Sequence, residues 1–235
     1  MTVRRWIADR VQGDKAWLLA QNASHLFRVL RVKPGHQFEV VADGVVRLGT
    51  VVFAAEHEVE FHLEEEIAGA SIPEVAVYLS IFKFDRMEWA LEKLTELGVA
   101  SIVPLIAERC GHHLVKAAAT RLPRWRKIVH ESAQQARRVA PPEIGEPAKL
   151  KAMVASVEDH RIVLSEAEKS VSLKSALVGC SAPLALAFGP EGGWTSEEVA
   201  IFQGAGWKSA SLGGTILRAE TAAIAAVAVA MAELH

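Results

Sequence analysis

The sequence predicts an α/β fold in two parts: a small β-rich domain at the N-terminus and a larger domain with a mostly parallel sheet. Over residues 1–70, apolar and polar positions alternate within short segments, as they do in half-buried strands. Beyond Pro73, short apolar segments alternate with longer amphipathic ones, which is typical of the strands and helices of a parallel sheet. The 235 residues, 51% of them hydrophobic, are enough for one large domain and one small one.

The small domain is expected to be a β-barrel. Residues 38–42 and 45–53 flank the pair Asp43-Gly44, which is typical of the tight turn of a β-hairpin. Residues 59–63 alternate again. The acidic run 64–66, followed by Gly69, Ser71 and Pro73, predicts an exposed linker. We therefore place the boundary after residue 70, so that residues 1–70 and 71–235 form the two domains.

In the second domain, strands are expected at residues 75–82, 100–106, 161–164, 184–188 and 209–212. Asp85 is expected to cap a helix that ends at Gly98. Further helices are expected around residues 125–132, from Ser196 onward, and over residues 218–234. This order of elements indicates a largely parallel sheet.

Basic residues gather in two segments although the net charge is only −2. Residues 1–36 carry seven Lys and Arg against two Asp, and residues 109–138 carry eight against one Glu. A local cationic surface of this kind favours binding of a polyanion, whatever the overall charge. Solvated helix faces have the same composition, so the charge pattern alone leaves both interpretations open.

Membrane insertion and metal binding have no support in the sequence. The longest apolar run, residues 222–232, is too short to span a bilayer, and residues 1–7 lack the core of a signal peptide. Cys110 and Cys180 offer no disulfide framework. Cys110 with His112 and His113 lacks further ligands at a suitable spacing. We expect a cytoplasmic protein that uses no metal.

Three loops follow strand ends in the last third of the chain, where parallel sheets bind their ligands. They are residues 165–166, 189–194 and 213–217. Glycines in the second loop let backbone groups come close to a ligand, and Trp194 is the aromatic residue best placed to stack on a base. The loop lacks the Lys-Ser/Thr pair of a P-loop and the glycine spacing of a dinucleotide site. A flat, polar ligand such as a nucleoside cofactor suits this arrangement.

Glu220 lies at the start of an alanine-rich helix that is expected to be buried. A buried carboxylate without a partner is costly, so we expect an arginine or backbone donors beside it. The alternative is that Glu220 only interacts with the dipole of its own helix.

The motifs around these loops resemble a known family. Phe188-Gly-Pro-Glu-Gly-Gly-Trp194, with Leu212-Gly213 and Ile216-Leu-Arg-Ala-Glu-Thr-Ala222, resembles the paired cofactor loops of the SPOUT methyltransferases. More narrowly, the chain is similar to the RsmE family, which methylates N3 of a uridine in small-subunit ribosomal RNA. Matching motifs in the same order lie at residues 24–35, 86–98, 108–110 and 124–144.

This resemblance implies a C-terminal SPOUT-type α/β domain with a deep trefoil knot and an N-terminal PUA-like β-barrel that binds RNA. It implies S-adenosylmethionine as cofactor and a homodimer with active sites at the subunit interface. The implied cofactor-binding residues lie in the three loops: Leu164, Ser165, Phe188, Gly189, Pro190, Glu191, Gly192, Gly193, Leu212, Gly213, Ile216, Leu217, Arg218 and Thr221.

The resemblance also implies 16S ribosomal RNA, or the small ribosomal subunit, as the substrate. The residues expected to bind RNA are mostly basic: Arg4, Arg10, His25, Arg28, Arg31, Arg109, Gln135 and Arg138.

For catalysis, Arg138, supplied by the partner subunit, is the first candidate for the cation that stabilises negative charge on the uridine. Arg218 is the second, with the alternative that it holds Glu220. Glu191 is expected to accept the N3 proton or a hydrogen bond from the cofactor. The alternative is that it holds its own loop in place. The chain departs from the family pattern at Gln134, Arg137 and Thr215.

Other functions stay open. One is another RNA methyltransferase of the same superfamily, acting on a base or a ribose. A second is a non-catalytic RNA-binding or ribosome-assembly factor with the same fold. A nucleotide-phosphate enzyme is disfavoured because the glycine loop has no lysine.

Overall fold

The computed structural model describes residues 5–67, 72–156 and 160–234. The chain divides into two compact units, and the first is discontinuous in sequence. Residues up to 71 and residues 133–141 form the N-terminal unit, and residues 72–132 and 142–235 form the C-terminal unit. The expected boundary after residue 70 lies outside the described residues. The inclusion of residues 133–141 in the first unit was not expected.

The N-terminal unit contains a six-stranded sheet with the order β1-β4-β5-β6-β3-β2. All pairings are antiparallel except that of β1 with β4. A short helix α1 (Ala20–Ser24) and a π-helical turn η1 (His25–Val29) connect β3 to β4. Its core includes Trp6, Leu18 and Phe61. The strands are β1 (Arg5–Ile7), β2 (Arg10–Gln12), β3 (Lys15–Leu19), β4 (Gln37–Ala42), β5 (Val45–Ala54) and β6 (Glu58–Ile67).

The β4–β5 hairpin confirms the interpretation of Asp43-Gly44 as a tight turn. Both residues have positive φ angles, 51° and 81°, which such a turn requires. The expected linker at residues 64–66 is wrong, because β6 continues to Ile67. There β6 pairs with β5, and Arg47 Nε donates a hydrogen bond to the Glu64 carbonyl at 2.9 Å. Pairing with a neighbouring strand therefore outweighs the local acidic composition.

The C-terminal unit contains a seven-stranded sheet with the order β10-β8-β7-β12-β11-β13, with β9 also pairing with β8. Every pairing is parallel, as expected. The five expected strands are present, and β9 and β10, of two residues each, were not expected. The strands are β7 (Val75–Ser80), β8 (Ser101–Ile106), β9 (Glu143–Ile144), β10 (Ala148–Lys149), β11 (His160–Leu164), β12 (Leu184–Phe188) and β13 (Lys208–Ala210).

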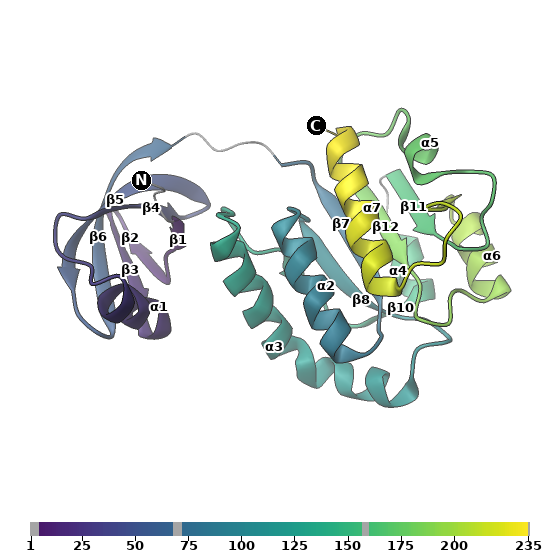
Figure 1. Cartoon of the computed structure of the whole chain (residues 1–235), viewed down its shortest axis with the longest axis horizontal. Coiled ribbons are helices and arrows are strands. Elements are labelled where there is room, and N and C mark those ends of the chain that lie inside the picture. Colours follow the sequence, from purple (N-terminus) through teal and green to yellow (C-terminus); the bar gives the residue numbers. More distant parts are fainter. Residues whose placement is uncertain (1–4, 68–71, 157–159, 235) are drawn as a thin grey trace. The chain divides into compact units, whose positions relative to one another are not determined.

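Helices cover both faces of this sheet (Figure 1). Along β12, Leu184, Leu186 and Phe188 face one hydrophobic core, and the two alanines between them face another. The first core includes residues of α2 (Phe84–Glu96), α3 (His112–Gln135), α5 (Leu173–Leu177) and α7 (Ala219–Leu234). The second includes residues of α4 (Leu150–Ser156) and α6 (Ser196–Gly204). A sheet covered on both faces explains why β12 is apolar throughout.

The ends of α2 differ in part from expectation. Lys83 is the N-cap, and Asp85 lies in the first turn, where its negative charge interacts favourably with the positive end of the helix dipole. The expectation that Asp85 caps the helix is therefore wrong. Gly98 follows the C-cap Leu97 with φ of +97°, and its N–H donates to the Thr95 carbonyl at 3.1 Å, which confirms the expected end of the helix.

Candidate functional site

The three loops that the sequence singled out leave neighbouring strands of the parallel sheet. β11 lies between β12 and β13, so the carboxyl ends of all three strands are adjacent. Leu164, Phe188 and Ala210 end these strands, and the Ser165 N–H donates to the Ala210 carbonyl at 2.9 Å. The three loops that contain most of the predicted cofactor residues therefore leave the same edge of the sheet, where parallel sheets bind ligands.

The glycine loop, residues 189–195, is joined to the loop after β11 by Trp194. Its Nε1 donates to the Leu164 carbonyl at 2.9 Å. Its ring packs edge to face against Phe202, with centroids 4.9 Å apart. A Cβ atom at Gly189 would lie 3.2 Å from Trp194 Cε2, so the loop backbone approaches the ring closely. The ring is part of the loop's own packing and is half-buried, and its stacking on a base stays a prediction.

Arg109 holds the middle of the glycine loop. Its NH1 donates to the Gly192 carbonyl at 2.6 Å and to the Trp194 carbonyl at 3.4 Å. A Cβ atom at Gly192 would lie 3.3 Å from Arg109 Cδ, so a larger residue would crowd this contact. The sequence suggested an RNA contact for Arg109; in the structure its guanidinium binds loop backbone.

The far end of the glycine loop leads into α6 through a capping box. The Thr195 hydroxyl accepts from the Glu198 N–H at 3.2 Å, and Glu198 Oε2 accepts from the Thr195 N–H at 2.9 Å. Glu198 is buried, with 6% of its surface exposed, and its Oε1 accepts from the Glu108 N–H at 2.8 Å. One carboxylate therefore joins the start of α6 to the segment that carries Arg109.

Glu191, at the tip of the glycine loop, forms an ion pair with Arg86 on α2, with 2.7 Å between Oε1 and NH1. Arg86 Nε also lies 3.8 Å from Oε1 of Glu220, which is buried at the start of α7. The expectation that Glu220 pairs with an arginine is confirmed, but the arginine is Arg86 and not Arg218. Among the described residues, Glu220 Oε2 has no hydrogen-bond partner.

The loop after β13, residues 211–218, is tied to the segment before α5. The Ser211 N–H donates to the Val171 carbonyl at 2.9 Å, and the Leu173 N–H donates to the Ser211 carbonyl at 2.8 Å. Ile216 is 83% exposed, and Gly213, Arg218 and Thr221 are also exposed. An exposed isoleucine between backbone-rich loops offers an apolar contact for a flat ligand.

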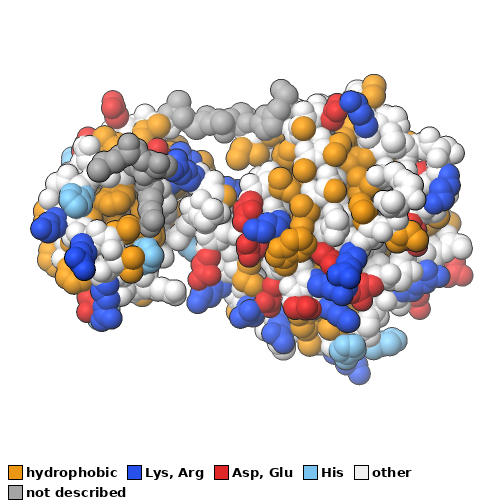
Figure 2. All heavy atoms as spheres, viewed as in Figure 1, with side chains coloured by type: hydrophobic (Ala, Val, Ile, Leu, Met, Phe, Trp, Pro, Cys, Tyr) orange, Lys and Arg blue, Asp and Glu red, His pale blue; other side chains and the backbone are white. Residues whose placement is uncertain are grey.

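The candidate RNA contacts of the N-terminal unit are partly neutralised by ion pairs. Arg10 pairs with Glu58 at 3.1 Å, and Arg28 pairs with Glu56. His25 and Arg31 are exposed, and Arg4 lies outside the described residues. On the C-terminal unit, Figure 2 likewise shows Lys and Arg beside Asp and Glu. Four arginines of the two basic segments, Arg10, Arg28, Arg124 and Arg126, therefore each lie beside a carboxylate.

Gln135 and Arg138 belong to the residues that cluster with the N-terminal unit. The Arg138 N–H donates to the Ala133 carbonyl at 2.9 Å, and its side chain is half-buried. Burial lowers the pKa of the Arg138 guanidinium from its ordinary value. Arginine nevertheless stays protonated at any physiological pH, so a partly desolvated cation results.

Within residues 5–67, 72–156 and 160–234, no three His, Cys, Asp or Glu side chains come together as metal ligands. In the same part of the chain, no helix is both long enough and apolar enough to cross a bilayer. Cys110 is buried, and its thiol donates a weak hydrogen bond to the Leu105 carbonyl at 3.7 Å. The thiol is therefore packed inside the fold.

The family of RNA methyltransferase domains matches residues 70–231. Ribosomal RNA small subunit methyltransferase E of Aquifex aeolicus is 30% identical over 207 residues, which cover 87% of this chain and 89% of that protein. The protein of the same name from Mycobacterium bovis is 32% identical over 229 residues, covering 92% and 83%.

Two similar structures contain a cofactor. A Legionella pneumophila protein solved with bound SAM has a TM-score of 0.84 and 28% identity, with 99% of this chain and 98% of that chain covered. Ribosomal RNA small subunit methyltransferase E from Neisseria gonorrhoeae, bound to S-adenosyl methionine, has a TM-score of 0.84 and 27% identity, covering 96% and 95%. These likenesses confirm the expected fold class, a SPOUT-type trefoil-knot α/β domain with a PUA-like β-barrel domain.

Proposed function

The chain belongs to the RNA methyltransferase family, among the ribosomal RNA small subunit methyltransferases E, and from this premise we propose that it methylates N3 of a uridine in 16S ribosomal RNA. The methyl donor in this proposal is S-adenosylmethionine. The observation that carries the proposal is that three strand-end segments are joined: Trp194 links the loop after β12 to Leu164, and the Ser165 N–H donates to the Ala210 carbonyl at the end of β13. Arg109 and Arg86 hold the glycine loop from other elements. Two relatives with this architecture were solved with that cofactor.

The residues at the strand ends fit such a cofactor. Its purine and ribose carry donors and acceptors that backbone N–H and C=O groups complement, and the three loops are held as backbone-lined turns. Glu220 Oε2 is a buried acceptor without a donor among the described residues, which suits a ligand with N–H groups or positive charge. When bound, the cofactor supplies a methyl group that a sulfonium makes electrophilic.

The residues proposed to hold the cofactor come from the three loops and the start of α7. Leu164 ends β11 and Ser165 follows it, and Phe188 ends β12. The others are Gly189, Pro190, Glu191, Gly192 and Gly193 in the glycine loop, and Leu212, Gly213, Ile216, Leu217, Arg218 and Thr221 around the loop after β13.

For the uridine, the step forms an N3–methyl bond, breaks the sulfur–methyl bond and releases the N3 proton. Negative charge spreads over N3, O2 and O4 as that proton leaves, and a nearby cation stabilises it. We assign this role to Arg138, supplied by the partner subunit of a homodimer. Partial burial supports the assignment, because charges interact more strongly where water is excluded.

Arg218 and Glu191 were the other catalytic candidates. Arg218 is exposed at the start of α7, where it is proposed to contact the cofactor or the substrate. The Arg86 ion pair of Glu191 favours its alternative role, holding the loop, because the Glu191 Oε1 atom is already engaged by the guanidinium at 2.7 Å.

RNA binding is proposed to involve the N-terminal unit through Arg4, Arg10, His25, Arg28 and Arg31, with Gln135 near the uridine. Phosphate contacts of this kind supply affinity without sequence information. N3 lies on the pairing edge, so the base has to be unpaired or turned out of its stack to react. An rRNA-modifying role supports a cytoplasmic location.

The deciding experiment is mass spectrometry of ribosomal RNA from a deletion strain, before and after addition of the purified protein and S-adenosylmethionine. The proposal expects one uridine to lack a methyl group in the deletion strain and to regain it with the protein. Primer extension then distinguishes the alternatives, because an N3 methyl blocks base pairing and stops the polymerase, whereas a ribose methyl largely does not. Unchanged RNA in both tests would favour a non-catalytic RNA-binding factor.

A further inference from the structure

The guanidinium of Arg86 contacts carboxylates on both sides of the proposed cofactor site. Its NH1 lies 2.7 Å from Glu191 Oε1 in the glycine loop, and its Nε lies 3.8 Å from Glu220 Oε1 at the start of α7. Glu191 lies 105 positions after Arg86 in the sequence, and Glu220 lies 134 positions after it. A planar guanidinium presents several donors in a rigid fork, so one arginine serves two acceptors in a way that lysine does not.

The two halves of this cluster differ in burial. The Glu220 side chain is 6% exposed, and a carboxylate buried in this way is strongly destabilising without a cation. The Glu191 side chain is 41% exposed and lies on a loop. Arg86 and Glu220 therefore form the fixed part of the cluster, and Glu191 is the part through which the loop attaches.

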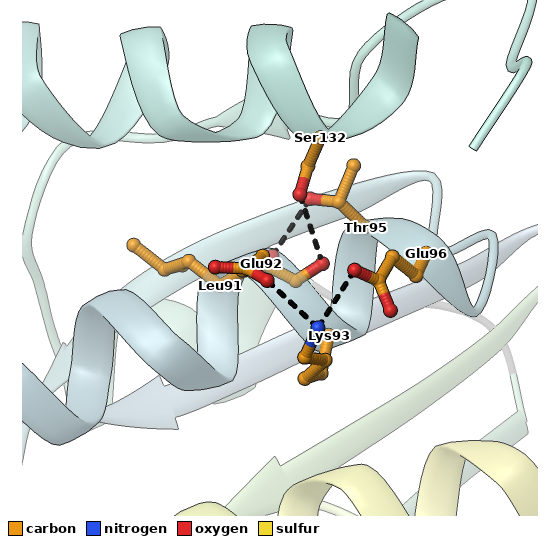
Figure 3. Close-up of polar contacts among 6 residues, drawn as sticks. All are labelled: Leu91, Glu92, Lys93, Thr95, Glu96 and Ser132. Carbon is orange, nitrogen blue, oxygen red and sulfur yellow. Dashed lines mark hydrogen bonds and ion pairs between the residues drawn. The ribbon is translucent and has the colours of Figure 1, made fainter. Parts of the chain in front are cut away.

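The helix that carries Arg86 is itself well anchored (Figure 3). Ser132 Oγ on α3 donates to the Glu92 carbonyl of α2 at 3.4 Å. The Thr95 hydroxyl donates to the Leu91 carbonyl at 2.7 Å, and Lys93 lies between Glu92 and Glu96 at 2.7 and 2.8 Å. The Ser132 contact and the buried apolar face of α2 anchor the helix that carries Arg86, and the Thr95 and Lys93 contacts lie within the helix.

We propose that Arg86 is a positioning residue for the cofactor: through Glu191 it holds the glycine loop at the spacing from α7 that S-adenosylmethionine requires. This inference rests on the proposed function, because it assigns Arg86 a task within that same site. It predicts that the Arg86–Glu191 contact changes cofactor affinity without changing RNA affinity.

The test measures S-adenosylmethionine binding by calorimetry in the wild type, R86Q, E191Q and the double variant. E191Q is expected to weaken binding about threefold, as for loss of one half-exposed ion pair. R86Q is expected to weaken it about tenfold, because Glu220 also loses its cation. If Arg86 acts through Glu191, the double variant binds like R86Q alone.

The pair between Glu88 on α2 and Arg124 on α3 provides a matched control. Arg124 Nε and NH2 lie 2.6 and 2.7 Å from the Glu88 carboxylate, two residues along α2 from Arg86. R124Q removes the same charge and should leave cofactor affinity within twofold of wild type. Circular dichroism and thermal unfolding show which variants are folded; if R86Q is not, R86K and E191Q carry the test.

The proposal would be overturned if R86Q and E191Q bound S-adenosylmethionine within twofold of the wild-type affinity, as the control R124Q is expected to do. Losses that multiply in the double variant would also overturn it, as would a lower unfolding temperature with unchanged cofactor affinity. A wild type that binds no S-adenosylmethionine would instead refute the proposed function. An RNA affinity that falls in parallel with cofactor affinity would show that the cluster acts on the whole unit, which also contradicts this inference.

Discussion

The Glu198 carboxylate accepts a hydrogen bond from the backbone N–H of Glu108, 90 residues earlier, at 2.8 Å. With its other oxygen it accepts from the Thr195 N–H at 2.9 Å. Arg109, the next residue after Glu108, donates to the Gly192 carbonyl at 2.6 Å. The segment after β8 and the glycine loop are thus joined at two points by residues adjacent in sequence.

Replacing Glu198 by alanine should therefore destabilise the C-terminal unit. Two backbone N–H groups lose a charged acceptor, which costs about 2 kcal/mol when such groups are buried. Urea unfolding followed by circular dichroism measures the free energy of unfolding. Glu197 is the matched control because it is exposed on the same helical turn, and E197A should change stability by about 0.5 kcal/mol or less. Equal losses in the two variants would contradict this role for Glu198.

Gly189→Ala should weaken cofactor binding, because the added methyl would lie 3.2 Å from the Trp194 ring and displace it from Leu164. We expect an about fivefold rise in the dissociation constant for S-adenosylmethionine, the result of moving a preorganised loop. Gly204→Ala is the control. Among the described residues, a methyl group added there would meet no atom within 4 Å outside its own helix and chain neighbours. Similar cofactor affinities for the two variants would argue against a close fit at Gly189.

Arg138→Ala should abolish methylation while leaving cofactor affinity within a few-fold of wild type. Loss of a group that stabilises developing charge typically costs about a hundredfold or more in rate. Methyl transfer to ribosomal RNA from labelled S-adenosylmethionine measures the activity, and calorimetry measures the cofactor. An R138A variant that keeps most of its activity would refute the assigned role.

The two cysteines should react at very different rates. Burial raises the pKa of the Cys110 thiol, whereas Cys180 is only half-buried. At pH 8 a thiol reagent should label Cys180 in the folded protein, and Cys110 should react only after unfolding. Rapid labelling of Cys110 in the native protein would contradict its burial.

The same shift makes stability depend on pH. The neutral thiol is favoured in the folded protein, so the unfolded chain loses its proton first as the pH rises through 9.0, the ordinary value. The free energy of unfolding should then fall until the pH passes the raised folded pKa. Cys110→Ala should lack this alkaline component while keeping the rest of the pH profile.

Local patterns in the sequence predicted much of the fold. Asp43-Gly44 identified a hairpin, Gly98 identified a helix end, and the apolar run at residues 184–188 identified the central strand β12. These features depend on neighbouring residues, so sequence reasoning reaches them. The error at residues 64–66 arose because strand pairing across β5 and β6 outweighs composition.

The site was predicted less completely, because its anchoring contacts join residues far apart in sequence. A buried Glu220 required a cation, but nothing nearby in the chain pointed to Arg86. Arg109 was expected to bind RNA, which stays a prediction, but its bonds to carbonyls 83 and 85 positions away were not foreseen. The membership of residues 133–141 in the N-terminal unit also depends on contacts between residues far apart in sequence. One of these is the hydrogen bond that Arg5 donates to the Arg137 carbonyl.

The strand order of the parallel sheet also determines how much of the chain must be translated before the sheet can form. β7 pairs with β8 on one side and with β12 on the other, and Val75 lies opposite Leu184. While the ribosome makes the intervening residues, one edge of β7 lacks its partner, and an exposed apolar edge favours aggregation. A nascent chain stalled before residue 184 should therefore depend on chaperones, whereas one released at full length can complete the sheet.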